Sequence, residues 1–408
     1  MKSTTPFQNE SIQHFSEDHI KFILIAILAL YPLVGMGIDL IAPSLPAISH
    51  DLNVSNNFSK NLITFYLVGY MLGNFFIGFL SDAIGRRKPM LSGFIIFIIV
   101  SVLPAIFNKP FLLLIARFLQ GFTIAAFAVS GRAVLSDILP KDKLIRTATL
   151  IATMWGIGPI IGPVIGGYLQ FYFNWKMCFY FFAFMGLIGL LVMIFIIPET
   201  HFHKQPLQYK QLKNNFVSIM THRIFLGIVM LMGITYSLLI VFNTLGPFLI
   251  QTSLGYSSVY FGQVALLMGV IFLVGTFLCR RLLKQLYPED IFLYAILIFT
   301  FIAAAGVLLA LFYGNRIWVV ILPSLCMFLG CGIIYPTAMG KGISFFRHLA
   351  GSASATMNLI SISITSITAF VMSFIHADNV LIIAYIYFGL MALASVVYYF
   401  FIRPKNLV

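Results

Sequence analysis

The chain has 408 residues, of which 60% are hydrophobic and only 9% are charged, and its mean hydropathy is +1.00. This composition excludes a soluble globular domain and indicates a protein that crosses a membrane many times. The formal net charge of +13 arises from basic residues spread over loops, not from a patch with interleaved aromatics, so we expect no nucleic-acid partner.

Apolar stretches long enough to cross a bilayer, which needs about 20 residues, occur twelve times. They lie at about 21–48, 58–80, 88–107, 110–138, 146–171, 175–197, 223–250, 258–283, 288–313, 316–341, 348–375 and 380–402. We therefore expect an all-α polytopic membrane protein. The longest polar interruption falls at the midpoint and predicts a linker between two pseudo-symmetric six-helix bundles. The expected parts are a tail 1–20, a bundle 21–197, the linker 198–222, a bundle 223–403 and a tail 404–408.

The distribution of basic residues predicts the orientation of the chain. With an even number of helices both termini lie on one side, and nineteen of the 25 Lys and Arg residues then fall in tails and loops on that side. The opposite side has only four, which are Lys60, Lys109, Lys176 and Arg316. The positive-inside rule therefore places both termini in the cytoplasm of a cell whose inner membrane holds the protein. The first 20 residues lack a signal-peptide pattern, so the first helix is expected to be an uncleaved insertion signal.

Asp39, in the first span, is the only acidic residue of the chain that lies deep in a predicted helix. A carboxylate there costs about 2.5–3.5 kcal/mol on insertion scales, which makes it a functional candidate. It could take up and release protons. The alternative is a structural acid held by backbone donors or a neighbouring helix. Gly35, Gly37, Pro43 and Pro46 are expected to loosen the helix around it.

The loop Gly78–Lys88, between the second and third spans, resembles the signature loop of the major facilitator superfamily of transporters. That pattern, Gly-x-Leu-x-Asp-x-x-Gly-Arg-Arg/Lys, is filled by Gly78, Leu80, Asp82, Gly85, Arg86 and Arg87. The resemblance implies a charge network that holds one conformation and breaks in another. A basic loop that only sets topology is the alternative. Arg132 and Asp137, near the cytoplasmic end of the fourth span, are expected to join this conformational gate.

In the middle of the fourth span, Arg117 lies among apolar residues. A buried guanidinium stays charged and must find an anion or several carbonyls, and Asp39 is its natural partner. The stretch resembles the Arg-Phe-x-Gln-Gly motif of superfamily proton antiporters, which implies a part for Arg117 in proton transfer. The alternative is a structural role on the backbone of helix 1 or helix 5. Gln120 could extend either network.

The fifth span is rich in glycine and proline, which in a membrane give a close-packing, bendable face. The spacing is formed by Gly158, Pro159, Gly162, Pro163, Gly166 and Gly167. It is similar to the helix 5 motif that typifies drug:proton antiporters as against symporters. A generic packing helix is the alternative.

Three features together resemble the Bcr/CflA group of twelve-helix drug:proton antiporters. They are Asp39 followed by 43–46, the Arg117 motif, and 174–176 at the start of helix 6. The group's first helix usually reads closer to Thr-Asp-Met-Tyr-Leu-Pro, whereas 38–43 reads Ile-Asp-Leu-Ile-Ala-Pro here. Tyr31 stands where some relatives have a second acid, so this chain has one helix 1 carboxylate rather than two.

Polar and aromatic residues within spans are candidates for the walls of a substrate cavity, since such groups face a bundle interior more often than lipid. The candidates are Tyr31, Asp39, Tyr66, Tyr70, Asn74, Gln120, Tyr236, Asn243, Gln263, Tyr335 and Asn358. Each is equally compatible with a helix–helix hydrogen bond.

These patterns predict a monomeric, proton-coupled exporter of small amphipathic molecules, such as antibiotics, a siderophore or another metabolite. The proton gradient drives it, with no cofactor or metal. A proton-coupled uptake symporter on the same fold and a non-transporting membrane receptor are the alternatives. The sequence has no nucleophile–base constellation, nucleotide-binding loop or metal cluster, and its four cysteines lie in apolar segments, so we expect no enzyme activity.

Overall fold

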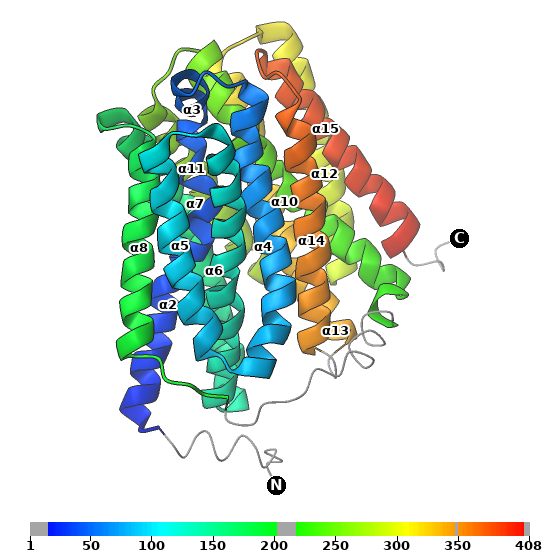
Figure 1. The fold of residues 1–408 in the computed structure, drawn as a ribbon. Coiled ribbons are helices and arrows are strands. Elements are labelled where there is room, and N and C mark those ends of the chain that lie inside the picture. The colour runs from blue at the N-terminus through cyan, green and yellow to red at the C-terminus, as the bar shows by residue number, and fades with distance from the viewer. Residues whose placement is uncertain (1–14, 202–217, 347–349, 404–408) are drawn as a thin grey trace. The chain divides into compact units, whose positions relative to one another are not determined.

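The computed structural model describes residues 15–201, 218–346 and 350–403 (Figure 1). The expected tails, apart from 15–20, and most of the expected linker lie outside these residues. The described part of the chain contains twelve helices that are long and apolar enough to cross a membrane. This confirms the all-α, twelve-span prediction.

The helices of the first half follow the predicted spans closely. They are α2 (Glu17–Asp39), η1 (Ala42–Ser44), α3 (Leu45–Asp51), α4 (Asn56–Ile84), α5 (Arg87–Phe107), α6 (Pro110–Ile138), α7 (Lys141–Tyr172) and α8 (Lys176–Phe195). The first span is broken, because α2 ends at Asp39 and the chain continues through η1 into α3. Pro43 and Pro46 explain the break, since each removes a backbone donor from the helical ladder.

The second half continues in the same way, with short π-helical turns after two of its helices. Its elements are α10 (Arg223–Pro247), η2 (Phe248–Ser253), α11 (Ser258–Leu282), α12 (Pro288–Tyr313), α13 (Ile317–Phe345), α14 (Ala350–Ser373), α15 (Val380–Val397) and η4 (Tyr398–Ile402). Local sequence sets several ends. Pro288 begins α12, where its missing N–H costs nothing, and Gly314 ends that helix with a φ of 65°.

The chain divides into two compact units, and unit 1 consists of 1–41, 65–162 and 172–207. In it α5 packs between α6 and α8, and α2 packs against α6 and α8 (Figure 1). Small residues allow this close packing: a Cβ atom at Gly189 would overlap the ring of Phe94. The ring of Phe97 meets Phe182 edge-on, with the centroids 6.1 Å apart.

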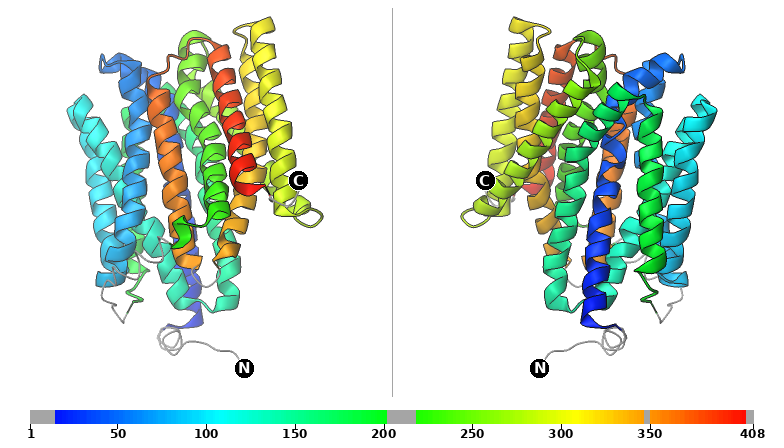
Figure 2. Two further views of the ribbon diagram at one scale, coloured as in Figure 1. Left: turned by 90° about the vertical axis from the view of Figure 1, so that its right-hand side faces the viewer. Right: turned by 90° about the vertical axis from the view of Figure 1, so that its left-hand side faces the viewer.

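Unit 2 consists of 42–64, 163–171 and 208–408. Its central helix is α10, which packs against α13, α14 and α15 (Figure 2). Most residues of α10 are buried, as expected of a helix that is apolar all round. The short segments 42–64 and 163–171 pack with this unit although they precede the midpoint of the sequence. The division into bundles 21–197 and 223–403 therefore stays a prediction.

Candidate functional site

Arg117 on α6 lies in the centre of unit 1 with 0% of its side chain exposed. Its Nη2 donates to the carbonyl oxygen of Gly37 on α2 at 2.8 Å, and its Nη1 donates to Oε1 of Gln120 at 3.0 Å. The amide Nε2 of Gln120 donates in turn to Oγ of Ser101 on α5, at 2.8 Å. The guanidinium thus donates to acceptors on α2 and α6. Ser101 on α5, which no sequence pattern indicated, extends this network through Gln120.

Tyr66 on α4 covers the same guanidinium. The Arg117 Cζ atom lies 4.4 Å from the centroid of the Tyr66 ring, a distance at which a cation–π attraction operates. The Tyr66 hydroxyl lies against Gly37, where a Cβ atom would overlap it. Glycine is therefore required at this point of α2 for the ring to reach the cation.

Asp39 is the last residue of α2 and is 3% exposed. Asp39 comes two residues after Gly37, whose carbonyl oxygen accepts from Arg117. Electrostatic interactions connect its carboxyl group with both Arg117 and Tyr66. The structure therefore brings the two residues predicted for proton coupling into one buried cluster on α2, α4 and α6.

A second polar cluster in unit 1 joins predicted cavity residues to Arg132. The Ala128 carbonyl oxygen accepts from Tyr31 Oη at 2.9 Å and from Arg132 Nε at 3.0 Å. Arg132 Nη2 donates to Oδ1 of Asn74 at 3.3 Å, and the Asn74 amide donates to the carbonyl oxygen of Tyr70 at 2.7 Å. Arg132, expected at the gate, thus lies with the cavity candidates.

The cavity candidates of unit 2 are less tightly grouped. Tyr236 on α10 and Tyr335 on α13 face each other with ring centroids 5.6 Å apart. Asn243 is buried on α10 and Asn358 is half-buried on α14, whereas Gln263 is exposed near the start of α11. Tyr236 and Tyr335 are the pair that the structure brings together.

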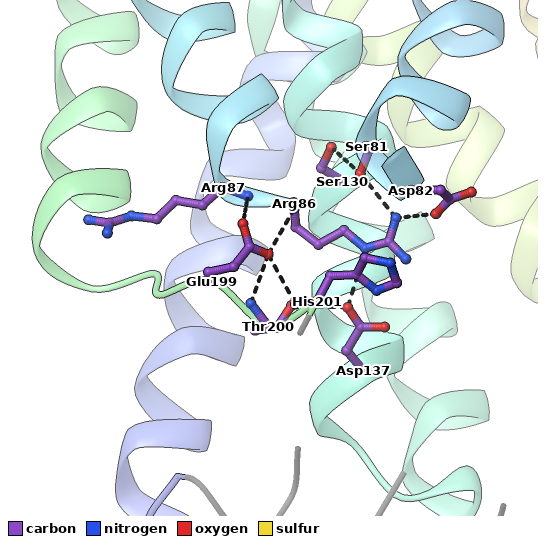
Figure 3. Close-up of polar contacts among 9 residues, drawn as sticks. All are labelled: Ser81, Asp82, Arg86, Arg87, Ser130, Asp137, Glu199, Thr200 and His201. Atoms are coloured by element: carbon purple, nitrogen blue, oxygen red, sulfur yellow. Dashed lines mark hydrogen bonds and ion pairs between the residues drawn. The ribbon is translucent and has the colours of Figure 1, made fainter. Parts of the chain in front are cut away.

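Arg86 organises a charged network at one end of unit 1 (Figure 3). Its Nη1 donates to Ser81 Oγ at 3.1 Å and makes an ion pair with Asp82. Its Nε lies 3.3 Å from Oδ2 of Asp137, which also accepts from the Thr200 hydroxyl at 3.0 Å. Asp82, Arg86 and Asp137 of the predicted gate are therefore in direct contact.

Glu199, which the sequence analysis did not identify, completes this network from the segment after α8 (Figure 3). Its carboxylate accepts from the backbone N–H groups of Arg86 at 2.9 Å and Arg87 at 3.1 Å, where α5 begins. It also accepts from those of Thr200 and His201, both at 3.0 Å. Partial burial alone would raise the pKa of Glu199, but these backbone donors outweigh it and hold the pKa below its usual value.

Glycine at position 85 is required by both conformation and space. Gly85 has a φ of 102°, which side chains rarely adopt, and a Cβ atom there would overlap the Glu199 carboxylate. At Gly78, by contrast, the nearest atom to an added Cβ is 3.8 Å away, on Val129. The Arg87 side chain turns away from the network and donates to the Ile194 carbonyl at 2.9 Å.

The glycines of α7 form close contacts in each unit. In unit 1, a Cβ atom at Gly158 would overlap backbone atoms of α2, and one at Gly162 would lie 3.1 Å from the Met36 Cβ. In unit 2, Ser258 at the start of α11 donates to the Gly167 carbonyl at 3.0 Å. A Cβ atom at Gly262 of α11 would lie only 2.7 Å from the carbonyl oxygen of Pro163.

Pro159 and Gly166 occupy the same helix as these glycines. A Cβ atom at Gly35 of α2 would lie 2.9 Å from the Pro159 ring, which adds a proline contact to the packing of α7 on α2. Gly166 is buried in the part of α7 that belongs to unit 2. Both glycine-rich stretches of α7 are therefore packing surfaces.

Comparison with known proteins identifies the family. The model of the Major Facilitator Superfamily matches residues 27–370. The chain belongs to the major facilitator superfamily. Its members are transporters and not enzymes, so this chain is a multi-pass membrane transporter of small molecules.

Two relatives are similar to this chain in sequence, and one solved structure shares its fold. The chain is 26% identical to a bicyclomycin resistance protein homolog of Haemophilus influenzae, over 95% of this chain and 97% of that protein. It is 26% identical to the multidrug resistance protein MdtL of Shigella flexneri, over 83% of this chain and 84% of that protein. The crystal structure of a D-xylose–proton symporter matches with a TM-score of 0.77, covering 95% of this chain and 99% of that one at 14% identity. At that identity the match shows the fold alone.

Proposed function

We propose that this transporter exports small amphipathic molecules, such as antibiotics, a siderophore or another metabolite, in exchange for protons. The observation that carries the proposal is the buried cluster of Asp39, Arg117 and Tyr66. The names of the relatives, a bicyclomycin resistance protein homolog and a multidrug resistance protein, support export of antibiotics. The glycine and proline spacing of α7, similar to that of drug:proton antiporters, supports exchange rather than symport.

In this mechanism Asp39 is the proton carrier. When it is ionised, its charge is balanced by the neighbouring guanidinium of Arg117. A guanidinium keeps its proton at physiological pH. When Asp39 is protonated, the balance is lost and the site favours a different arrangement of α2 and α6. Because substrate and proton favour opposite charge states of Asp39, each can displace the other. Gly37 and Tyr66 keep the guanidinium fixed while the carboxyl changes.

The remaining elements of the proposal concern the whole cycle. Two six-helix bundles expose the site alternately to each side, and the Asp82–Arg86–Asp137 network holds one state closed. The protein works as a monomer in the inner membrane with both termini in the cytoplasm, as the positive-inside rule supports. No cofactor is required, because the proton gradient supplies the energy.

The test uses purified protein in liposomes with an imposed pH gradient and a fluorescent drug. Asp39→Asn keeps the shape but cannot ionise, so we expect proton-driven transport to fall to the level of empty liposomes. Asp39→Glu retains a carboxyl group and is expected to keep partial activity. Normal gradient-driven transport by Asp39→Asn would overturn the assignment. Substrate movement in the same direction as the protons would show that the protein is a symporter.

A further inference from the structure

Arg132 is a membrane-embedded cation that the proton-coupling mechanism does not use. It lies on α6 six residues before the helix ends at Ile138, which places it about 9 Å inside the helix end at 1.5 Å per residue. Its side chain is half-buried. Its described hydrogen bonds go to two neutral oxygens, the carbonyl of Ala128 and the amide of Asn74.

Among the residues that the structure describes, none places a carboxylate within 4.0 Å of the Arg132 guanidinium. The nearby acids are used elsewhere, because Asp82 and Asp137 both pair with Arg86. A guanidinium keeps its charge in proteins and does not face hydrocarbon, so its accessible part must face an interior, hydrated path. Nη1 carries no described hydrogen bond, which leaves one edge of the planar fork available to an anion.

Aromatic rings connect this cation to the proton-coupling cluster. Tyr70 is half-buried and interacts electrostatically with Arg132. The ring of Tyr70 lies nearly parallel to that of Tyr66, with centroids 6.4 Å apart, and Tyr66 covers Arg117. A ligand whose anionic group binds Arg132 on α6 would therefore have the rings of Tyr70 and Tyr66, both on α4, beside it.

We propose that Arg132, Asn74 and Tyr70 form an anion subsite, so that the preferred substrates are amphipathic aromatic molecules with a carboxylate, including zwitterions. The charges support this class. Asp39 is balanced by Arg117, and Arg132 adds a positive charge that no described acid compensates. A bidentate guanidinium–carboxylate contact is among the stronger charge-assisted hydrogen bonds. The inference rests on the proposed function, since it assigns the substrate class of the same transporter.

The experiment compares two probes that differ only in the anion, the fluorescent zwitterion norfloxacin and its methyl ester. Binding is measured by fluorescence anisotropy on purified full-length protein at pH 7 without a proton gradient. We expect the wild type to bind the acid about tenfold more tightly than the ester, the value of one charge-assisted contact. Arg132→Gln should bring the ratio to about one, and Arg132→Lys should leave it between these values. Arg316→Gln, the same change at an exposed position, is the control and should keep the wild-type ratio.

Several outcomes would overturn the proposal. Equal binding of the two probes by the wild type, or binding of neither, would overturn it. The proposal would also fail if Arg132→Gln kept the wild-type ratio. If Arg132→Gln lost affinity by the same factor for both probes, Arg132 would have a structural role only. Thermal melting of each variant shows whether it is folded. Because the ratio is an equilibrium quantity, it stands apart from the Asp39→Asn transport test, whose failure would concern only the proton exchange.

Discussion

The charged end of unit 1 depends on one carboxylate, that of Glu199, which receives four backbone N–H groups. Two of them belong to Arg86 and Arg87 at the start of α5, where the helix dipole also favours a negative charge. The contact fixes the segment after α8 to the start of α5. It therefore stabilises the arrangement in which Arg86 meets Asp82 and Asp137.

Glu199→Gln is expected to lower the thermal midpoint at pH 7 by about 2–4 °C, because the amide loses the charge and turns an N–H₂ group toward backbone donors. The folded-state pKa of Glu199 is below the ordinary value of 4.5. The stabilisation is therefore fully present above pH 4.5 and is lost as the pH falls through the folded-state pKa. Melting curves from pH 7 to pH 3 should show the two proteins converging. Glu17→Gln, at an exposed position, is the control, and a gap that stays constant with pH would contradict the role.

Asp39 and Arg117 are predicted partners because each charge is conspicuous in an apolar span, and both lie in the buried cluster around Tyr66. Ser101 and Glu199 give no such signal, since a serine in a span and an acid beside a linker are unremarkable until their partners are known. The partner of Glu199 lies 113 residues away in the sequence. The position of Arg132 near the end of its span predicts a gate residue, whereas the direction of the side chain around α6 decides its contacts.

At the scale of elements, the glycines of α7 are not equivalent. A Cβ atom at Gly158 would overlap the Pro32 carbonyl oxygen and the Met36 nitrogen, which are backbone atoms of α2 and cannot turn aside. A Cβ atom at Gly156, two residues earlier on the same helix, would have nothing within 4 Å. The difference between these positions allows a matched test of the packing surface between α7 and α2.

Gly158→Ala should destabilise the protein by about 1–3 kcal/mol, the cost of overpacking a close contact, and should slow transport. Gly156→Ala should stabilise it by up to about 1 kcal/mol, because alanine is the better helix former and has room. Thermal melting and transport by the two purified variants provide the measurement. If both substitutions move the midpoint in the same direction by similar amounts, Gly158 is not a close-packing position.

Hydrophobic length alone was sufficient to predict the twelve helices, because a bilayer requires nearly the same span from each. For the first span, 21–48, the sequence predicts a loosened helix through Pro43 and Pro46 but not the end of α2 at Asp39. The assignment of chain segments to the two compact units could not be predicted from the sequence. That 42–64 and 163–171 pack with residues of the second half depends on contacts between distant segments, which no local pattern records.

At the scale of the whole molecule, three contacts within unit 2 join early segments of the chain to late ones. Lys60 Nζ donates to the Ile375 carbonyl at 2.6 Å, and Gln251 donates to the Pro43 carbonyl at 2.9 Å. The third contact runs from Ser258 to the carbonyl of 167. The sequence predicts only a loop charge at Lys60. In the structure Lys60 is 1% exposed and its Nζ lies 4.9 Å from the centre of the Phe248 ring. These contacts join segments of the predicted bundles 21–197 and 223–403, so the proposed alternating access would require them to break and re-form in each cycle.

Lys60→Met should therefore favour the state in which this end of unit 2 is open. The substitution leaves the Ile375 carbonyl, just after the end of α14, without its cationic donor. A hydrogen bond to a charged group is worth about 1.5–3 kcal/mol, or a shift of about 10- to 100-fold in the equilibrium. Spin labels at Val54→Cys and His376→Cys, in a protein whose four native cysteines are replaced by alanine, would report the distance across the contact. We expect a new population at longer distance. Lys109→Met, at an exposed position, should leave the distribution unchanged. An identical distribution in Lys60→Met and the wild type would show that Lys60 anchors the fold in every state and does not act as a latch.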